Sequence, residues 1–259
     1  MIGGPSDRTS PRVTHPETSV STGIKPLERS MQVPEEAPVR IDYNGRTAAG
    51  LLCSPRDLAE LAAGWLFSEG FLHAPDELIT LGACPDMRAV SVRAAPDRWD
   101  DASRRPRVLA SGCGAGRVSL DSLPRLAAGV PPRPNCGLLR RMLADAAEYR
   151  RTGGIHSAAL SDGAAILCRF EDIGRHNAVD KVIGWGFLRR APFAGTQLLT
   201  TGRVAAEMLG RTARAGIPVV IALSVPTNLA VEFARRTGTL LVGRALRAEP
   251  IVYNDPTEP

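Results

Sequence analysis

After Gly154, short apolar runs alternate with segments whose apolar residues recur every three or four positions. Short apolar runs favour buried strands, and the longer spacing favours amphipathic helices. Because strands and helices alternate across short joints, this part of the chain is predicted to form a mainly parallel sheet wrapped by helices. The expected strands are 155–160, 164–170, 196–199, 217–223, 239–242 and 251–253, and the expected helices are 175–188, 203–215 and 227–237.

The chain before Gly154 is predicted to contain a smaller set of strands. Residues 39–43 alternate between apolar and polar side chains, which is typical of a half-buried strand. Asn44-Gly45 then predicts a hairpin turn into a second strand that ends near Cys53. Further strands are expected at 89–92 and 107–110.

Two helices are also predicted in this first part. Ser54-Pro55 is a helix start, with serine as the N-cap and proline at the first helical position. The apolar stripe from Leu58 to Leu66 predicts the buried face of this helix, and Gly70 predicts its end. A second helix is expected at 138–150.

The pattern divides the chain into three parts. Residues 1–33 are rich in Pro, Ser, Thr and charged residues without periodicity, so they are predicted to be a disordered tail. The segment Pro131-Pro132-Arg133-Pro134 marks a domain boundary. We therefore expect a smaller α+β domain at 34–135 and an α/β domain at 136–259.

Composition narrows the class of protein. The 259 residues are 44% hydrophobic and 23% charged, as in ordinary soluble domains. No apolar run is long enough to span a bilayer, and the start lacks the apolar core of a signal peptide, so a cytoplasmic protein is expected. The net charge of +5 is mild and no basic stripe is present, so neither nucleic acid nor a membrane is an expected partner.

The cysteines suggest sulfur chemistry at one position. The chain has five, an odd number without a CxxC pair, which favours neither a disulfide framework nor a zinc site, and no metal is expected. Cys113 stands apart, because Gly112 and Gly114 flank it and Arg117 follows. Positive charge favours the thiolate, which suits covalent sulfur carriage. The alternative is a Gly-rich loop that cradles a phosphate and contains an incidental cysteine.

Three joints between a strand and a helix carry polar or small residues: 171–177, 200–203 followed by Glu207, and 224–227. Ligands of open α/β sheets bind beyond the carboxyl ends of parallel strands, where helix N-termini expose N–H groups. Joints on one edge would form a pocket for a phosphorylated or nucleotide-like ligand. The alternative is that Thr201, Ser224 and Thr227 are plain N-caps.

The stretch 170–181 concentrates acids, Arg175, His176, an amide and Lys181 at the start of a predicted helix. It is either a candidate catalytic or ligand-binding cluster or a helix start whose acids cap it. His156 likewise allows two interpretations: it is either a residue of the functional site or a hydrogen-bonded histidine of the core. Val179, Val182 and Ile183 predict the apolar face of this helix, and Asn177, Lys181 and Gly184 line the opposite face.

From about Val33 to Tyr253 the chain resembles the formate dehydrogenase accessory sulfurtransferase family, FdhD. The matching motifs occur in order along this length. They are Val33-Pro34-Glu35-Glu36, Asn44-Gly45, Ser54-Pro55-Arg56-Asp57-Leu58, Leu66-Phe67-Ser68-Glu69-Gly70, Gly112-Cys113-Gly114, Gly153-Gly154-Ile155-His156, Glu171-Asp172-Ile173-Gly174-Arg175-His176-Asn177-Ala178-Val179-Asp180-Lys181 and Ser224-Val225-Pro226-Thr227-Asn228-Leu229-Ala230.

The resemblance implies a C-terminal domain with a cytidine-deaminase-like α/β sandwich fold that lacks the zinc chemistry. It implies a cytoplasmic homodimer that takes persulfide sulfur from a cysteine desulfurase. The sulfur passes to the molybdenum of a bis-molybdopterin guanine dinucleotide cofactor before the cofactor enters the formate dehydrogenase catalytic subunit. GDP would mimic this cofactor. By the same resemblance, the persulfide cysteine is Cys113, and a cofactor-binding segment is Arg244-Ala245-Leu246-Arg247-Ala248-Glu249.

Two departures from the family leave other functions open. Gly116 stands where many members have a second cysteine, which favours a non-catalytic chaperone that binds and protects the cofactor. A deaminase-like hydrolase is the third possibility, although the chain lacks the zinc ligands of that class. The second departure is in the segment 244–249, which ends in an acid, unlike the usual family pattern.

The remaining residues expected to bind the cofactor are His156, Arg175, His176, Arg203, Ser224 and Thr227.

Overall fold

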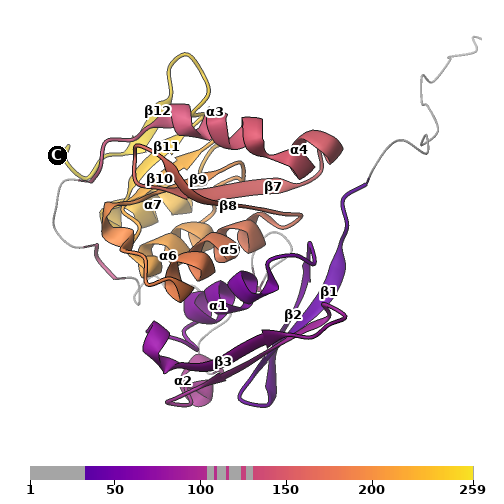
Figure 1. Cartoon of the computed structure of the whole chain (residues 1–259). Helices are drawn as coiled ribbons and strands as arrows, with labels where there is room; N and C mark the ends of the chain where they lie inside the picture. Colours follow the sequence, from indigo (N-terminus) through magenta and orange to yellow (C-terminus); the bar gives the residue numbers. More distant parts are fainter. Residues whose placement is uncertain (1–32, 104–107, 110–114, 117–123, 127–130, 259) are drawn as a thin grey trace, which may run out of the picture. The chain divides into compact units, whose positions relative to one another are not determined.

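Two mixed β-sheets and the helices packed on them form the described part of the chain (Figure 1). The computed structural model describes residues 33–103, 108–109, 115–116, 124–126 and 131–258. The first sheet has the strand order β2-β1-β4-β3 and the second has the order β12-β11-β10-β9-β7-β8, while β5 pairs with β6. The elements in chain order are β1 (Ala37–Tyr43), β2 (Arg46–Cys53), α1 (Leu58–Glu69), β3 (Leu78–Ala83), β4 (Ala89–Ala94), α2 (Trp99–Ser103), β5 (Val108–Leu109), β6 (Ala115–Gly116), α3 (Cys136–Asp145), α4 (Ala147–Thr152), β7 (His156–Ser161), β8 (Ile166–Asp172), α5 (Arg175–Leu188), β9 (Gln197–Thr200), α6 (Ala206–Ala215), β10 (Val219–Ala222), α7 (Asn228–Thr237), β11 (Leu240–Gly243) and β12 (Ile251–Asn254).

The two sheets come from different parts of the sequence. The first is built from residues 37–94 and the second from residues 156–254, on either side of the boundary predicted at 131–134. Helix α1 and the layer of α5, α6 and α7 lie between the sheets, and α3 lies on the outer face of the second sheet (Figure 1). The predicted α/β class is thus confirmed. Among the described residues, no helix has the length and hydropathy needed to cross a membrane.

The first sheet buries one face against α1, as its alternating sequence predicts. Val39, Ile41 and Tyr43 of β1 are buried, while Arg40 is exposed and Asp42 is partly exposed. Asn44 and Gly45 both have positive φ, 50° and 81°, which the predicted hairpin turn requires. Strand β3, which the sequence pattern did not predict, pairs antiparallel with β4, and β4 lies parallel to β1.

The predicted start of α1 is wrong by one turn. The helix begins at Leu58 with Asp57 at the N-cap position, so Ser54 does not cap it. Instead the Ser54 hydroxyl accepts a hydrogen bond from the Ile173 N–H (3.2 Å), and the Ser54 N–H donates to the Asp172 carboxylate (3.2 Å). These contacts with the end of β8 engage the groups that a cap would use. The predicted end at Gly70 is confirmed, with φ 82°.

Helices α1 and α5 cross at two glycines. A Cβ on Gly64 would lie 1.8 Å from the Asp180 carbonyl oxygen, and a Cβ on Gly184 would lie 1.9 Å from the Glu60 carbonyl oxygen. The two backbones therefore approach as closely as they do because neither residue has a side chain. This crossing holds the first sheet, through α1, against the helix layer of the second.

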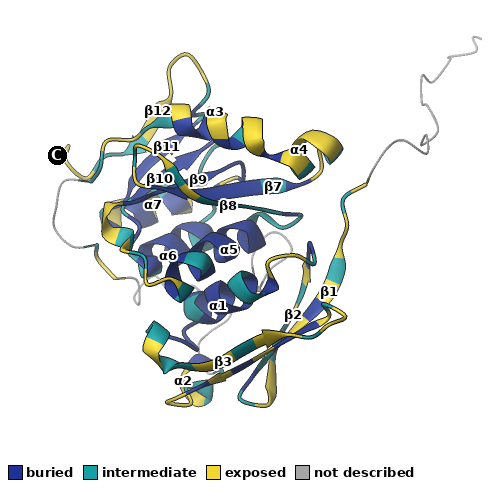
Figure 2. Cartoon of the chain, viewed as in Figure 1, coloured by how far each residue is buried: buried dark blue, intermediate teal, exposed yellow. Residues whose placement is uncertain are grey.

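The second sheet is covered on both faces. Leu198 and Val220 face α5, α6 and α7, whereas their neighbours Leu199 and Ile221 face α3. All four are buried, and Figure 2 shows the central strands as a buried layer. Strands β9, β10 and β11 are parallel, but β7, β8 and β12 run antiparallel to their neighbours. The sheet is therefore mixed, and the mainly parallel prediction is correct only for its centre.

The helix predicted at 138–150 is two helices. Helix α3 ends at Asp145 and α4 starts at Ala147, because the backbone of Ala146 leaves the helical region. The carboxylate of Glu171 accepts the N–H groups of Glu148 (3.2 Å) and Tyr149 (2.7 Å) at the start of α4. A side chain from β8 thus satisfies the second helix start, which the local sequence alone did not indicate.

Candidate functional site

The predicted joints do lie on one edge of the second sheet. Strands β9, β10 and β11 are parallel, so their carboxyl ends share this edge. Strand β7 begins and β8 ends here, because His156 is paired with Asp172 and Ala158 with Thr200. Helices α5, α6 and α7 follow β8, β9 and β10 directly, so their N-termini lie near the same edge. This is the position at which α/β sheets bind ligands.

One group of predicted residues gathers around the start of α5. The Nδ1 atom of His156 lies 3.3 Å from the Thr201 hydroxyl. A Cβ on Gly202 would lie 2.8 Å from the Cβ of Arg175, so the arginine packs across the glycine. Burial lowers the pKa of His156, and Arg175 and His176 act in the same direction. The imidazole of His156 is therefore neutral at pH 7, and Arg175 is the permanent positive charge of this group.

His176 lies against an acid from the next helix. Its Nε2 atom is 3.2 Å from the Oε2 atom of Glu207 in the first turn of α6. The distance is that of an ion pair, but the two atoms are not aligned as a hydrogen bond, and Nε2 is buried without a hydrogen-bond partner among the described residues. The two side chains are therefore close without forming a hydrogen bond.

A second group lies where β10 and β11 end. The Arg244 N–H donates to the Ser224 carbonyl oxygen (2.9 Å), and Arg244 has a positive φ of 52°. The Nε atoms of Arg244 and Arg175 are both buried without a hydrogen-bond partner among the described residues. Buried donors without partners cost free energy, so an acceptor from a ligand would be favourable at each. An open pocket of about 410 Å³ adjoins this group, lined by Leu223, Ser224, Val225, Arg244, Leu246 and Arg247.

The other predicted binding residues are less closely gathered. Arg203 is exposed beside the edge and makes none of the ion pairs found between described residues. The Thr227 hydroxyl accepts the Ala230 N–H (3.2 Å), so Thr227 is an N-cap, as the simpler alternative predicted. Ala245 is buried below the edge, while Ala248 and Glu249 are exposed and line a separate depression next to β12.

The charged stretch 170–181 divides into two parts with different roles. Asp172 and Lys181 are fully buried, and their side chains pair at 2.7 Å. The Lys181 ammonium also donates to the carbonyl oxygens of Ser54 (3.2 Å) and Glu171 (3.3 Å). These residues hold the end of β2 against β8 and α5, while Arg175 and His176 remain at the sheet edge. The sequence placed Asn177, Lys181 and Gly184 on the face of α5 opposite its apolar residues, and the structure buries this face as well.

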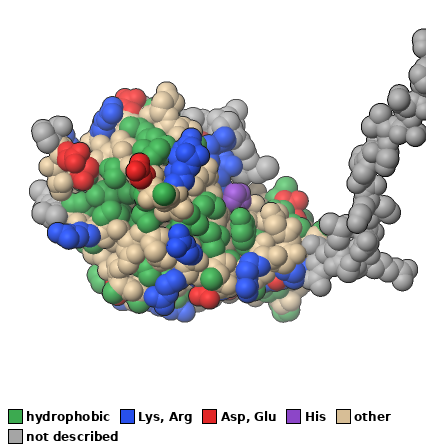
Figure 3. Space-filling view, turned by 90° about the horizontal axis from the view of Figure 1, so that it is seen from above, with side chains coloured by type: hydrophobic (Ala, Val, Ile, Leu, Met, Phe, Trp, Pro, Cys, Tyr) green, Lys and Arg blue, Asp and Glu red, His purple; other side chains and the backbone are tan. Residues whose placement is uncertain are grey.

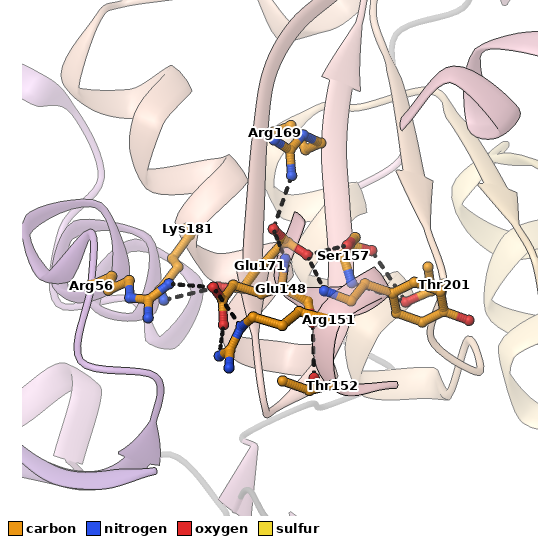
Figure 4. A network of polar contacts seen from close by, with 10 residues as sticks. Arg56, Glu148, Arg151, Thr152, Ser157, Arg169, Glu171, Lys181 and Thr201 are labelled. Atoms are coloured by element: carbon orange, nitrogen blue, oxygen red, sulfur yellow. Dashed lines mark hydrogen bonds and ion pairs between the residues drawn. The ribbon is translucent and has the colours of Figure 1, made fainter. Parts of the chain in front are cut away.

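Glu171 joins the sheet edge to a wider polar network, which Figure 4 shows from close by. Its carboxylate accepts hydrogen bonds from the Arg169 guanidinium (3.1 Å) and from the Tyr149 N–H at the start of α4 (2.7 Å). The Ser157 hydroxyl lies 3.5 Å from the same carboxylate. The Ser157 N–H in turn donates to the Thr201 hydroxyl (3.0 Å). Thr201, predicted either as a pocket residue or as a helix cap, is therefore held by β7 and caps no helix.

The predicted persulfide cysteine, Cys113, lies outside the described residues. In sequence it falls between β5 and β6, which pair antiparallel. Burial raises the pKa of Cys53 and of Cys168 to about 12, so both are thiols at neutral pH. Burial also raises the pKa of Cys136. Within the described part of the chain, no group of His, Cys, Asp and Glu side chains could hold a metal ion.

Basic residues do not form one stripe on the face that carries α3. Figure 3 shows this face, where arginine side chains are scattered among hydrophobic and acidic ones. Arg140 and Arg141 of α3 are exposed. Exposed arginines are common on the surface and do not mark a site by themselves. The Nε donors of Arg175 and Arg244 differ from them because they are buried and have no hydrogen-bond partner among the described residues.

The fold and this edge define a mixed α/β protein in which two arginine Nε donors are buried without a partner among the described residues, at the edge where the parallel strands of the second sheet end. Residues 34–258 match the FdhD/NarQ family, and the chain belongs to that family. The resemblance inferred from the motifs is thereby confirmed.

Named relatives match most of the chain. The chain is 36% identical over 242 residues to the sulfur carrier protein FdhD of Burkholderia mallei (strain ATCC 23344), covering 86% of this chain and 88% of the relative. It is 32% identical over 231 residues to the protein of the same name in Staphylococcus aureus (strain MRSA252), covering 85% and 86%. A crystal structure of a formate dehydrogenase accessory protein from Desulfotalea psychrophila is similar with a TM-score of 0.71 and 28% identity, covering 87% of this chain and 89% of that one.

Proposed function

We propose that this chain carries persulfide sulfur from a cysteine desulfurase to the molybdenum of a bis-molybdopterin guanine dinucleotide cofactor, before that cofactor enters formate dehydrogenase. The observation that carries the proposal is the pair of buried, unpaired Nε donors of Arg175 and Arg244 at the edge of the second sheet. Anionic groups such as the phosphates of a guanine dinucleotide supply the acceptors that these donors lack. The relatives named sulfur carrier protein FdhD support the sulfur-transfer half of the proposal.

In this proposal the covalent step belongs to Cys113 and the sheet edge binds the cofactor. The buried thiols of Cys53 and Cys168 have pKa values of about 12, so they hold almost no thiolate at neutral pH and are poor carriers. The binding residues are the two groups at the sheet edge, together with Arg203 and the segment 244–249. The protein acts as a homodimer in the cytoplasm.

Cys113→Ala is expected to abolish sulfur loading. Wild type, Cys113→Ala and the matched control Cys84→Ala are incubated with a cysteine desulfurase and cysteine, and bound sulfane sulfur is measured. Cys84 is a partly exposed cysteine at the turn between β3 and β4. Cys84→Ala is expected to take up sulfur like wild type, because sulfur loading depends on Cys113 and not on every accessible thiol. Equal sulfur on wild type and Cys113→Ala rejects the carrier function.

The second candidate function is a non-catalytic chaperone, favoured by Gly116 at the place of a second family cysteine. Formate dehydrogenase activity in cells distinguishes it. Cells whose only copy is Cys113→Ala are expected to lack the activity if sulfur transfer is required. Full activity with this variant would establish the chaperone function instead.

His176→Ala and Arg203→Ala are each expected to weaken GDP binding about tenfold, because each removes a charge-assisted contact to phosphate. Isothermal titration calorimetry with GDP measures the affinity. Arg140→Ala, an exposed arginine on α3, is the matched control and is expected to bind like wild type. Unchanged affinity in both edge variants would place the nucleotide elsewhere.

A further inference from the structure

The contact between His176 and Glu207 has a feature that packing alone does not explain. His176 is 8% exposed, and its buried Nε2 atom has no hydrogen-bond partner among the described residues. Yet the Oε2 atom of Glu207 lies only 3.2 Å away. Contacts in unliganded sites are often long or misaligned and become hydrogen bonds when the ligand binds. A small rotation of either side chain would complete this one.

Glu207 also interacts with a buried arginine of its own helix. One turn further along α6, Arg211 is buried and interacts electrostatically with Glu207. Arg211 is fixed by the carboxylates of Asp180 (2.9 Å) and Glu69 (2.8 Å). The Ser68 hydroxyl of α1 also donates to Asp180 (3.0 Å). An electrostatic attraction to Arg211 therefore links Glu207 to an ionic network that joins α6, α5 and α1.

The surroundings of His176 on the other side suit an anion. No side chain caps the N-terminus of α5, where His176 is the second residue of the helix. Helix N-termini favour negative charge, and Arg175 adds a permanent positive charge with an unpaired, buried Nε. His156, also coupled electrostatically to His176, is held by Thr201. Glu207 therefore contacts the ring of His176, His156 and Asp180 interact with it electrostatically, and Arg175 precedes it in the chain.

We propose that Glu207 is the positioning residue for His176. Its carboxylate accepts the Nε2 hydrogen, which turns the ring so that Nδ1 can donate to an anionic oxygen of the ligand. In the complex the imidazole carries a hydrogen on each nitrogen and bridges Glu207 and a phosphate oxygen. This inference rests on the proposed function, because it assumes that the sheet edge receives the phosphate groups of a nucleotide. The same arrangement of acid behind histidine orients imidazoles in catalytic and metal sites.

Nitrogen NMR of ¹⁵N-histidine-labelled protein tests the bridge directly. The His176 ring is assigned by its absence in His176→Asn. With GDP bound, wild type is expected to show a hydrogen on both ring nitrogens, with Nε2 in a hydrogen bond. Glu207→Gln keeps the shape of the side chain but removes its charge, and it is expected to lose this signature. An identical His176 spectrum in wild type and Glu207→Gln, both with GDP, overturns the proposal.

Affinity provides the second measurement. Glu207→Gln is expected to bind GDP about tenfold more weakly than wild type, which is the low end of the effect of losing a supporting carboxylate. Glu207→Asp is expected to recover part of the loss, and Glu232→Gln, an exposed glutamate on α7, is the matched control. Wild-type affinity in Glu207→Gln overturns the positioning role. A wild-type protein that binds no GDP would contradict the proposed function, and the hydrogen on Nε2 measured without ligand would still test the contact with Glu207.

Discussion

Gly184→Ala is expected to destabilise the protein by about 3 kcal/mol or more, at the upper end of overpacking substitutions. The new methyl group would sit 1.9 Å from the Glu60 carbonyl oxygen and 2.7 Å from the Gly64 nitrogen. Both atoms belong to the backbone of α1, so no side-chain rotation relieves the clash. Helices α1 and α5 must separate, and the buried contacts on both sides of the crossing weaken. Urea unfolding followed by circular dichroism measures the loss.

A matched control separates the clash from the general effect of adding a methyl group. Gly195 has open space where a Cβ would lie and has no positive φ, so Gly195→Ala is expected to change the free energy of unfolding by less than about 1 kcal/mol. Gly64→Ala, on the opposite side of the crossing, is expected to resemble Gly184→Ala. Equal stability of Gly184→Ala and Gly195→Ala would mean that the two helices do not cross this closely.

Elements that depend on local sequence were predictable. The turn at Asn44 and Gly45, the end of α1 at Gly70 and the bounds 175–188 of α5 follow from backbone preferences and apolar periodicity. The start of α1 and the break between α3 and α4 were not. Both depend on side chains from β8, namely Asp172 and Glu171, which are distant in sequence. Tertiary hydrogen bonds there decide between local alternatives of similar free energy.

The candidate site shows the same division. The sequence indicated which joints would share an edge, because the order of strands and helices fixes where parallel strands end. It could not indicate that Thr227 is used as a cap while Thr201 supports β7 and His156. Residues with identical chemistry at equivalent joints differ only in their three-dimensional neighbours. The contact between His176 and Glu207 likewise joins helices that no sequence spacing relates.

Lys181→Met is expected to destabilise the protein by about 3–5 kcal/mol, the usual result of breaking a buried ion pair from one side. Lys181 and Asp172 are both fully buried and paired at 2.7 Å. Without the ammonium, the Asp172 carboxylate keeps the N–H groups of Ser54 and Gly174 as donors but has no compensating charge. The carbonyl oxygens of Ser54 and Glu171 lose a donor as well. Urea unfolding again measures the change.

The control for Lys181→Met removes the basic partner of an ion pair on the surface. Arg190 pairs with Asp76 where the two side chains are 61% and 76% exposed, so Arg190→Met is expected to cost less than about 1 kcal/mol. Asp172→Asn combined with Lys181→Met is expected to cost less than the sum of the single changes, because neither partner is then left charged and buried alone. A Lys181→Met variant as stable as Arg190→Met would contradict the buried pair. Since this pair fixes the start of α5, its loss is also expected to disturb Arg175 and His176 and so to weaken GDP binding without removing any group that contacts the nucleotide.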